Sequence, residues 1–533
     1  MRVSSNAVWL LLLQLIVALS MLDETKALFG GARNLGAGRP FRRAALGTAG
    51  YPPVHQQLRA GSSSDANDSS DANDSSDAND SSEVAAGPVK EEEEERVLIL
   101  MDGFCPYLGV YLGMQADQMS GVTVVPLLSH YLSAYLAMVD PETDYPRMPD
   151  TDEEWDQLDQ YLRGKIVTAV YCESDSGLAD AELVRHKLAV ACRDQPDQLD
   201  ARRNKFLMNQ VVSRAGLATA RQQLCETVEQ AQQFANELLD EESGGAGGRV
   251  VVKPYRGVAS ESVYLCKDAA QVQEAWHNIC STSVFGSKEQ HDTVLVQEYL
   301  QGVEYAVDMV SRNGQHKVAA VWRYDKRPAN GAAFLYFGTA LVDYRHDPDA
   351  QAACDYATQA LTALGVCWGL SHNEMIVTVE AGPVLVEVNC RQHNMDFMPL
   401  TMSCVGYNAL DMTLAALLGT DEDWDQYPDL PVLRAAGCMV HLVNYVSGRV
   451  TGVQHLEELN ELPSVLNWEI YETFAPNEDI EPTMDIRSDA GWVQLVSEDS
   501  QKLTQDFQRI VEWMPTMFQV QADADEKKTT GQS

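Results

Sequence analysis

Residues 372–391 read HNEMIVTVEAGPVLVEVNCR, two apolar stretches with alternating polar residues around the turn EAGP. Such alternation on both sides of a turn predicts a β-hairpin. The same period places Glu387, Asn389 and Arg391 on one face of the second strand, and folding brings Glu374 opposite Glu387. Facing carboxylates repel unless protonated or bridged, and Mg²⁺, which prefers oxygen ligands, would bridge them. A solvent-facing row of charges is the alternative.

Two lysines lie upstream, and the setting of the second one requires an anion. Lys205 lies in the first turn of a helix predicted from Asn204 to Ala215, with Gly216 ending it in a left-handed conformation. Lys253 ends the strand-like run RVVVK, where an unpaired charge is costly. A phosphate and a structural carboxylate are equally good partners for Lys253 on these residues alone.

Further carboxylates follow in the run VLVQEYL, residues 294–300, and the tripeptide Gly302-Val303-Glu304 directly after it. The run predicts a buried strand with Glu298 near its end. By themselves, Glu298 and Glu304 are more simply explained as solvated charges at a strand end.

The first part of the folded region predicts an α/β lobe. Apolar runs at 97–101, 122–128 and 166–172 predict parallel strands, and helical patterns at 155–162 and 181–190 alternate with them. No G-x-G-x-x-G follows the first strand, so a dinucleotide site is not supported.

Charge and cysteine content narrow the classes of function. Lys and Arg number 39 against 78 Asp and Glu, a formal net charge of -39, which opposes binding of nucleic acid. The 11 cysteines are scattered without a C-x-x-C pair, unlike a zinc site or a disulfide framework. They fit a reduced compartment, and packing is the better explanation for Cys172, Cys266 and Cys390.

The first 95 residues are expected to form a targeting sequence and a linker. Residues 1–27 have the pattern of a signal peptide, and the basic stretch that follows, within 28–95, has the composition of a transit peptide. Three copies of DANDSS at 65–82 and five glutamates at 91–95 then form a disordered acidic linker. This bipartite leader predicts import into a plastid, with the secretory pathway as the alternative. No stretch predicts stable membrane insertion.

The repeat also contains glycosylation sequons. They begin at Asn67, Asn73 and Asn79, although low-complexity repeats produce such tripeptides by accident.

The order of these motifs resembles the ATP-grasp superfamily over roughly residues 96–520. The resemblance rests on a first lysine, a second lysine on a strand, QEYL, G-x-E, then Glu374 and the E-x-N-x-R motif that begins at Glu387. Within the superfamily it is closest in pattern to carboxylate-amine ligases such as L-amino acid (dipeptide) ligases. The implied fold is α/β, of the α+β ATP-grasp type. A Rossmann-like pre-grasp lobe (96–200), an ATP-grasp domain of two nucleotide-clamping lobes (201–425), a C-terminal subdomain (426–522) and a tail (523–533) are expected.

The resemblance also implies roles for individual residues. The phosphates would be held by Lys205 and Lys253, the adenine pocket would be lined by Glu298, Tyr299 and Leu300, and the ribose would be bound by Glu304. The ligands of Mg²⁺ (or Mn²⁺) would be Glu374, Glu387 and Asn389. Arg391 would steady an acyl phosphate. ATP and Mg²⁺ are therefore the expected cofactors.

The implied reaction is ATP-dependent ligation of a small-molecule carboxylate to an amine. Ligases of this resemblance are often homodimers, but the sequence leaves the oligomeric state open. A purine-biosynthesis or carboxylation type of ATP-grasp enzyme, or a nucleotide-binding regulator without turnover, are the alternatives. The regulator is suggested by the loop at 256–262, which is poorer in glycine than is usual in the superfamily. Arg323, Lys326 and Arg327 could together grip a substrate carboxylate, or be ordinary surface charge. His372 and His393 are more simply structural than substrate-contacting.

Overall fold

The computed structural model describes residues 95–521, except 104–108, 120, 134–145, 243–247, 258–261, 284–289 and 394–396. The expected leader, the repeat linker with its three sequons and the C-terminal tail lie outside the described residues. Among the described helices, none is both long enough and apolar enough to cross a membrane.

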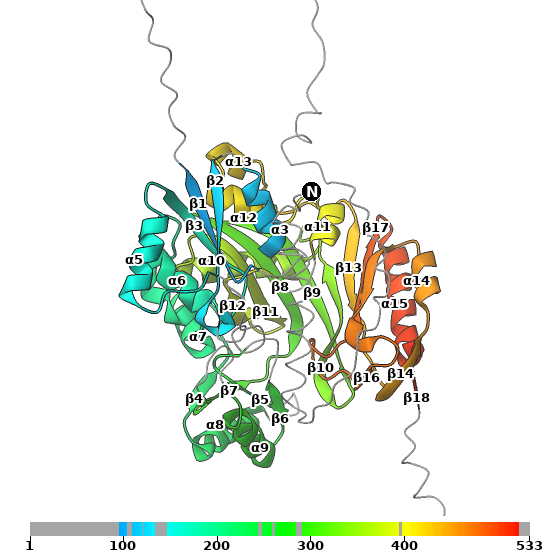
Figure 1. Cartoon of the computed structure of the whole chain (residues 1–533). Helices are drawn as coiled ribbons and strands as arrows, with labels where there is room; N and C mark the ends of the chain where they lie inside the picture. The colour runs from blue at the N-terminus through cyan, green and yellow to red at the C-terminus, as the bar shows by residue number, and fades with distance from the viewer. Residues whose placement is uncertain are drawn as a thin grey trace, which may run out of the picture. The chain divides into compact units, whose positions relative to one another are not determined.

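The N-terminal part is the α/β lobe that the sequence predicts (Figure 1). A central parallel strand pairs with one strand on each side, in the order β2-β1-β3. The strands are β1 (Arg96–Met101), β2 (Val122–Leu127) and β3 (Ile166–Cys172), and the helices are α3 (Gly109–Asp117), α5 (Asp152–Tyr161) and α6 (Leu178–Lys187). The continuous apolar run of β1 is explained by burial, because this strand is buried along almost its whole length.

A helix and a small antiparallel sheet follow. Helix α7 (Lys205–Arg214) begins at Asn204, whose side chain accepts from the backbone N–H groups of Phe206 and Leu207, and ends before Gly216 at φ +86°. The sheet has the order β4-β7-β5-β6, and two helices pack on it through one apolar cluster. These elements are β4 (Gln222–Cys225), α8 (Val228–Glu242), β5 (Val250–Lys253), β6 (Tyr264–Cys266), α9 (Ala269–Cys280) and β7 (Val294–Glu298).

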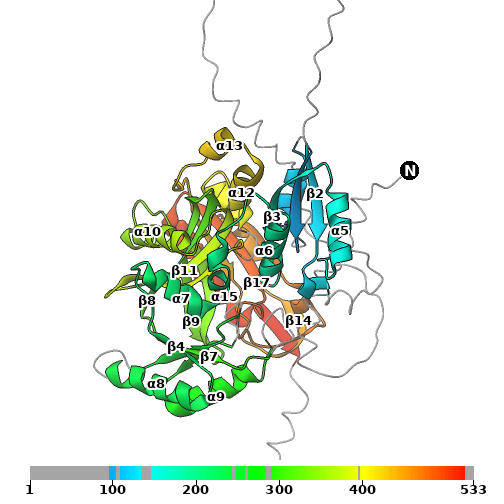
Figure 2. The same cartoon turned by 90° about the vertical axis from the view of Figure 1, so that its left-hand side faces the viewer.

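An eight-stranded antiparallel sheet forms the centre of the described structure, in the order β12-β11-β8-β9-β10-β13-β17-β15 (Figure 1). The turned view in Figure 2 labels β8, β9, β11 and β17 of this sheet. Its strands are β8 (Gly302–Arg312), β9 (Gln315–Ala329), β10 (Ala332–Leu341), β11 (Gly369–Thr378), β12 (Gly382–Asn389), β13 (Ala436–His441), β15 (Val465–Ile470) and β17 (Gly491–Ser497). The sheet therefore continues past residue 425, where the sequence analysis places a domain boundary.

Helices cover both faces of this sheet. Helix α10 (Pro348–Ala363) shares an apolar cluster with α7 and β8 on one face. Helix α12 (Ala409–Leu418) packs on β8 and β11 on the other side and joins the core of the N-terminal lobe. The remaining elements are α11 (Met398–Cys404), α13 (Asp421–Asp425), β14 (Gly448–Val453), α14 (Leu456–Glu461), β16 (Asp479–Ile480), α15 (Ser500–Met517), β18 (Phe518–Gln521) and the 3₁₀ turns Pro196–Gln198, Asp200–Arg202 and Glu472–Phe474.

The predicted hairpin is confirmed as β11 and β12, and its register pairs Glu374 directly with Glu387. The neighbouring strand β8 begins at Gly302, where a Cβ atom would lie 2.1 Å from the backbone oxygen of Val377. Only glycine permits this close approach, so the glycine of the G-x-E motif has a packing reason.

Candidate active site

One face of the large sheet carries a continuous polar network. Alternate residues of β9 contact its neighbours: the Trp322 indole N–H donates to Asp308 at 2.6 Å, and the Tyr324 hydroxyl donates to Glu374 at 3.3 Å. Two residues further along β9, Lys326 forms an ion pair with Glu304 at 2.7 Å. These groups are all at least half-buried, so the network lies under other elements rather than on open surface.

Glu374 receives its compensating charge from His372. The two side chains are 3.1 Å apart, and the other ring nitrogen of His372 lies 2.7 Å from Asp308. Burial opposes protonation of His372, but its hydrogen bonds to Asp308 and Glu374 raise its pKa to about 9. Burial would raise the pKa of Glu374 as well, yet the hydrogen bond from His372 holds that pKa far below its usual range. Glu374 is therefore an ionised carboxylate.

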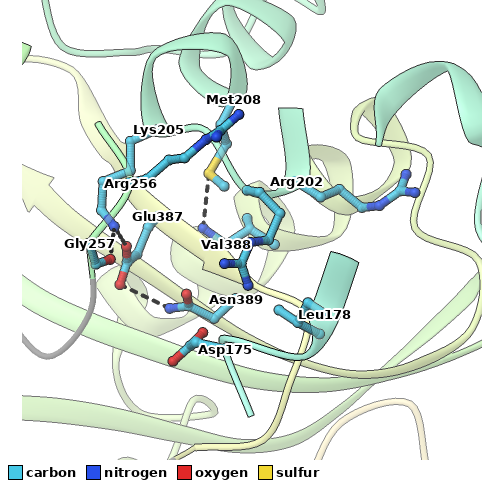
Figure 3. Close-up of a pocket in the computed structure, with 11 residues that line it drawn as sticks. Asp175, Leu178, Arg202, Lys205, Met208, Arg256, Gly257, Glu387, Val388 and Asn389 are labelled. Carbon is cyan, nitrogen blue, oxygen red and sulfur yellow. Dashed lines mark hydrogen bonds and ion pairs between the residues drawn. The ribbon is translucent and has the colours of Figure 1, made fainter. Parts of the chain in front are cut away.

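Glu387 receives its compensating charge from Lys205 (Figure 3). The Lys205 ammonium forms an ion pair with this carboxylate and also donates to the Gly257 backbone oxygen at 2.8 Å. The Asn389 amide donates to the other oxygen of Glu387 at 2.9 Å, which confirms that these two residues of β12 share a face. Each of the two facing carboxylates thus has a cation of its own.

Lys253 is buried at the end of β5, and its ammonium has no hydrogen bond or ion pair within the described residues. Burial and the nearby charge of Lys205 lower its pKa to about 8, against the opposing pull of Glu387, Glu374 and Glu304. A buried cation without a partner is expensive, so this lysine favours an anionic ligand. The sequence left two partners open for Lys253, a phosphate and a structural carboxylate. In the described part of the chain, no carboxylate forms an ion pair with Lys253.

The residues expected to hold adenine and ribose lie where β7 leads into β8. Glu298 accepts from the backbone N–H of Arg221 at 2.8 Å and from its side chain at 3.0 Å. Tyr299 lies 5.8 Å from the Arg249 guanidinium, and Glu304 pairs with Lys326. Their roles, including that of Leu300, stay predictions.

Arg391 is buried and forms an ion pair with Asp175 at 2.8 Å. Asp175 lies between β3 and α6 in the N-terminal lobe, and Arg391 holds its pKa below the usual range although burial opposes its charge. Asp175 was not among the predicted site residues. The available signal was its position just after a buried parallel strand, where binding residues of α/β lobes gather.

Asp175, Lys205, Glu387 and Asn389 line one pocket together with three arginines that were not among the predicted site residues: Arg202, Arg203 and Arg256. Figure 3 shows how side chains from α7, β12 and the loop after β5 surround it.

The suggested cluster of Arg323, Lys326 and Arg327 does not form a single group. Lys326 points to the polar network, whereas Arg323 is exposed and Arg327 pairs with Asp325 at 2.6 Å. The physical reason is the period of the strand, which sends residues 323 and 326 to opposite faces. A joint grip of the three on one carboxylate is therefore wrong.

Among the described residues, two groups of side chains could hold a metal ion. The ligand atoms of Asp308, His372 and His393 lie within 4.8 Å of one another, but the first two already share a short hydrogen bond and the two rings stack at 4.1 Å. The predicted set of Glu374, Glu387 and Asn389 offers hard oxygen atoms, and the Asn389 side-chain oxygen accepts no hydrogen bond among the described residues. This donor set fits Mg²⁺.

The chain is similar to known proteins in sequence and in fold. The sequence profile of a family described as ATP-grasp domain matches residues 247–396. Dapdiamide A synthase of Enterobacter agglomerans is 26% identical over 348 residues, 64% of this chain and 78% of that protein.

Two solved structures share the fold. The L-amino acid ligase from Bacillus licheniformis aligns with a TM-score of 0.59 at 16% identity, over 80% of this chain and 99% of that chain. The N5-carboxyaminoimidazole synthetase from Staphylococcus aureus complexed with ADP aligns with a TM-score of 0.53 at 18% identity, over 78% and 97%. The chain therefore contains an ATP-grasp domain. Its relatives include enzymes of the carboxylate-amine ligase type.

We predict that Asp308→Asn destabilises the fold by about 3–5 kcal/mol, because it removes the charge that His372 and Trp322 contact in a buried network. The measurement is the free energy of unfolding in urea at pH 7. Asp421→Asn is the matched control, because Asp421 also pairs with a cation, Arg312, but its side chain is 89% exposed. This control should leave the free energy of unfolding nearly unchanged. Equal stabilities of the two variants would contradict the prediction.

Proposed function

We propose that the protein is an ATP-dependent carboxylate-amine ligase that forms an amide or peptide bond through an acyl phosphate. The observation that carries the proposal is Lys253, which is buried near the paired carboxylates of the β11–β12 hairpin and has no hydrogen bond or ion pair within the described part of the chain. A metal-bound triphosphate requires a cationic side chain for its phosphates and a set of oxygen ligands for the metal ion, and the two lie near each other in this protein.

The nucleotide is assigned to the polar face between the small and large sheets. Lys253 and Lys205 would contact its phosphates, Glu298, Tyr299 and Leu300 would line the adenine, and Glu304 would contact the ribose. Glu374, Glu387 and Asn389 would hold Mg²⁺, which neutralises phosphate charge when it is bound. Mn²⁺ has the same ligand preferences, so the donor set does not distinguish the two ions.

The chemistry conserves atoms and charge in two steps. A carboxylate oxygen of the acid attacks the terminal phosphorus of ATP, the bond from that phosphorus to the ADP oxygen breaks, and ADP leaves with the electron pair. The amine nitrogen then attacks the acyl carbon, phosphate leaves with the electrons of the carbon–oxygen bond, and the nitrogen loses a proton. Arg391, which pairs with Asp175, would stabilise the oxygen charge that develops between the steps.

An ATP-grasp enzyme of the purine or carboxylation type is the second candidate. It is favoured by the structural similarity to the N5-carboxyaminoimidazole synthetase from Staphylococcus aureus. Such an enzyme would use bicarbonate or a phosphoribosylamine, so the co-substrate that stimulates ADP release separates the two candidates.

The ligase should release ADP only when ATP, Mg²⁺, a carboxylic acid and an amine are all present. The measurement is ADP release with amino acids offered singly and in pairs, beside bicarbonate. Hydroxylamine in place of the amine should yield a hydroxamate, because it captures acyl phosphates.

Glu387→Gln should lower the turnover at least ~100-fold, since it removes a metal ligand charge that neutralises the transferring phosphate. Glu457→Gln on the exposed face of α14 is the control and should retain wild-type turnover. ADP release that needs neither acid nor amine, or that is unchanged in Glu387→Gln, would sink the proposal.

Binding of ATP should weaken as the pH rises through about 8, the pKa of Lys253 in the free protein. The sign follows from the lowered pKa: below it Lys253 is protonated and attracts phosphate, and above it the charge is lost. The check is the dissociation constant for ATP between pH 6.5 and 9.5. Lys253→Arg keeps its charge over this range and should bind with little dependence on pH. A wild-type constant that stays flat would contradict this role of Lys253.

We also propose that residues 1–95 direct the protein to a plastid, from their signal-like and transit-like composition. A fluorescent protein fused behind residues 1–95 should then coincide with a plastid marker. Export of the fusion from the cell would favour the secretory alternative and overturn this proposal.

A further inference from the structure

The pocket that contains Lys205 and Glu387 carries more positive than negative charge. Four cationic residues line it, Arg202, Arg203, Lys205 and Arg256, against only two carboxylates, Asp175 and Glu387. This local excess stands out in a chain with a net charge of -39. Like charges gathered in a partly buried site raise the free energy of the protein unless an anion joins them.

Two of the four cations are already paired. Arg202 is buried and donates to Glu182 at 3.2 Å and to the backbone oxygens of Gln195 and Leu364. Lys205 pairs with Glu387. These two residues therefore need no ligand to be satisfied.

Arg203 and Arg256 are different. The Arg203 guanidinium has no hydrogen bond or ion pair within the described residues, and burial, more than any neighbouring charge, lowers its pKa. The buried Nε of Arg256 likewise has no hydrogen-bond partner there, and its guanidinium only faces the ring of Tyr255, at 5.4 Å. Two guanidinium groups with ten N–H donors between them thus line one pocket with few acceptors.

The carboxylates of the pocket have other partners. Asp175 is paired with Arg391, and Glu387 is paired with Lys205 and Asn389. The charge of Asp175 raises the pKa of Arg203, but this does not offset the effect of burial. Within the described residues, therefore, no hydrogen-bond acceptor is seen for the Arg203 guanidinium or for Nε of Arg256, and a ligand could supply it.

Contacts of the backbone hold the chain segments that carry Arg203 and Arg256 next to each other. Arg203 directly precedes the N-cap of α7, and the backbone N–H of Lys205 donates to the Tyr255 oxygen at 3.0 Å. The Lys205 ammonium donates to the Gly257 oxygen, on the other side of Arg256. The start of α7 and the loop after β5 are thus tied together on both sides of Arg256.

We propose that Arg203 and Arg256 form an oxyanion subsite that binds the terminal phosphoryl group of ATP during its transfer and as released phosphate. This inference rests on the proposed function. The pocket includes Glu387 and Asn389, two residues of the predicted metal set, so it adjoins the position of the terminal phosphate. Guanidinium groups suit the site because their planar donors match the spacing of phosphoryl oxygens. During transfer these oxygens carry the charge, and fixed donors there lower the barrier.

The test compares nucleotides that differ only in the terminal phosphoryl group. Dissociation constants of Mg²⁺-ATP and Mg²⁺-ADP are measured for the full chain by calorimetry, together with ADP release. Arg203→Gln should weaken ATP binding about 10-fold or more but ADP binding less than about 3-fold, and lower kcat about 100-fold, as loss of one oxyanion donor does. Arg203→Lys should recover part of kcat. Arg214→Gln, an exposed arginine on the same helix, is the matched control and should behave as wild type.

Arg256→Gln provides a second variant on a different element, so a folding defect of Arg203→Gln does not block the test. It should show the same selective loss of ATP. Equal losses for ATP and ADP in both variants would overturn the subsite, because they indicate a structural role.

Unchanged ATP binding with a raised KM for the acid would also overturn it, and would assign the arginines to a substrate carboxylate. If the unsubstituted protein does not bind Mg²⁺-ATP, the proposed function fails and the subsite fails with it. Wild-type binding with unselective variants removes the subsite alone.

Discussion

The pairing of Glu374 with Glu387 across the β11–β12 hairpin is the constraint around which the site is built. Two ionised carboxylates at adjacent positions of a sheet repel, so each needs a cation. His372 supplies one from the same strand, and Lys205 supplies the other from the start of α7. The sheet, the helix and the loop tied to it are therefore bound together by charge as well as by apolar packing.

The N-terminal lobe also contributes a charged partner to the site. Arg391 follows β12, and the carboxylate that neutralises it, Asp175, comes from the loop after β3. The lobe is thus more than a structural neighbour of the ATP-grasp domain, because it completes the charge balance of the site. The core of the lobe also includes α12, which packs on the large sheet.

Much of this arrangement follows from local sequence. Strands β1, β2 and β3, helix α7 with its cap at Asn204, and the hairpin with Glu374 opposite Glu387 were all predictable, because each depends on a period or a cap within a short segment. The ion-pair partners of the charged side chains could not be predicted in this way. Asp175 and Arg391 are 216 residues apart by their numbers, and no period links them. The extension of the large sheet by β13, β17 and β15 was missed for the same reason, since strand order is a long-range property.

The ion pair between Lys205 and Glu387 has a consequence for the order of events in the proposed reaction. Under the proposal, a metal ion that takes Glu387 as a ligand would release Lys205 from that carboxylate, and the freed ammonium could then meet an arriving phosphate. A nucleotide that arrives without its metal would find Lys205 still paired with Glu387. Two cations would thus compete for one carboxylate, and this competition would favour the metal complex over the bare nucleotide.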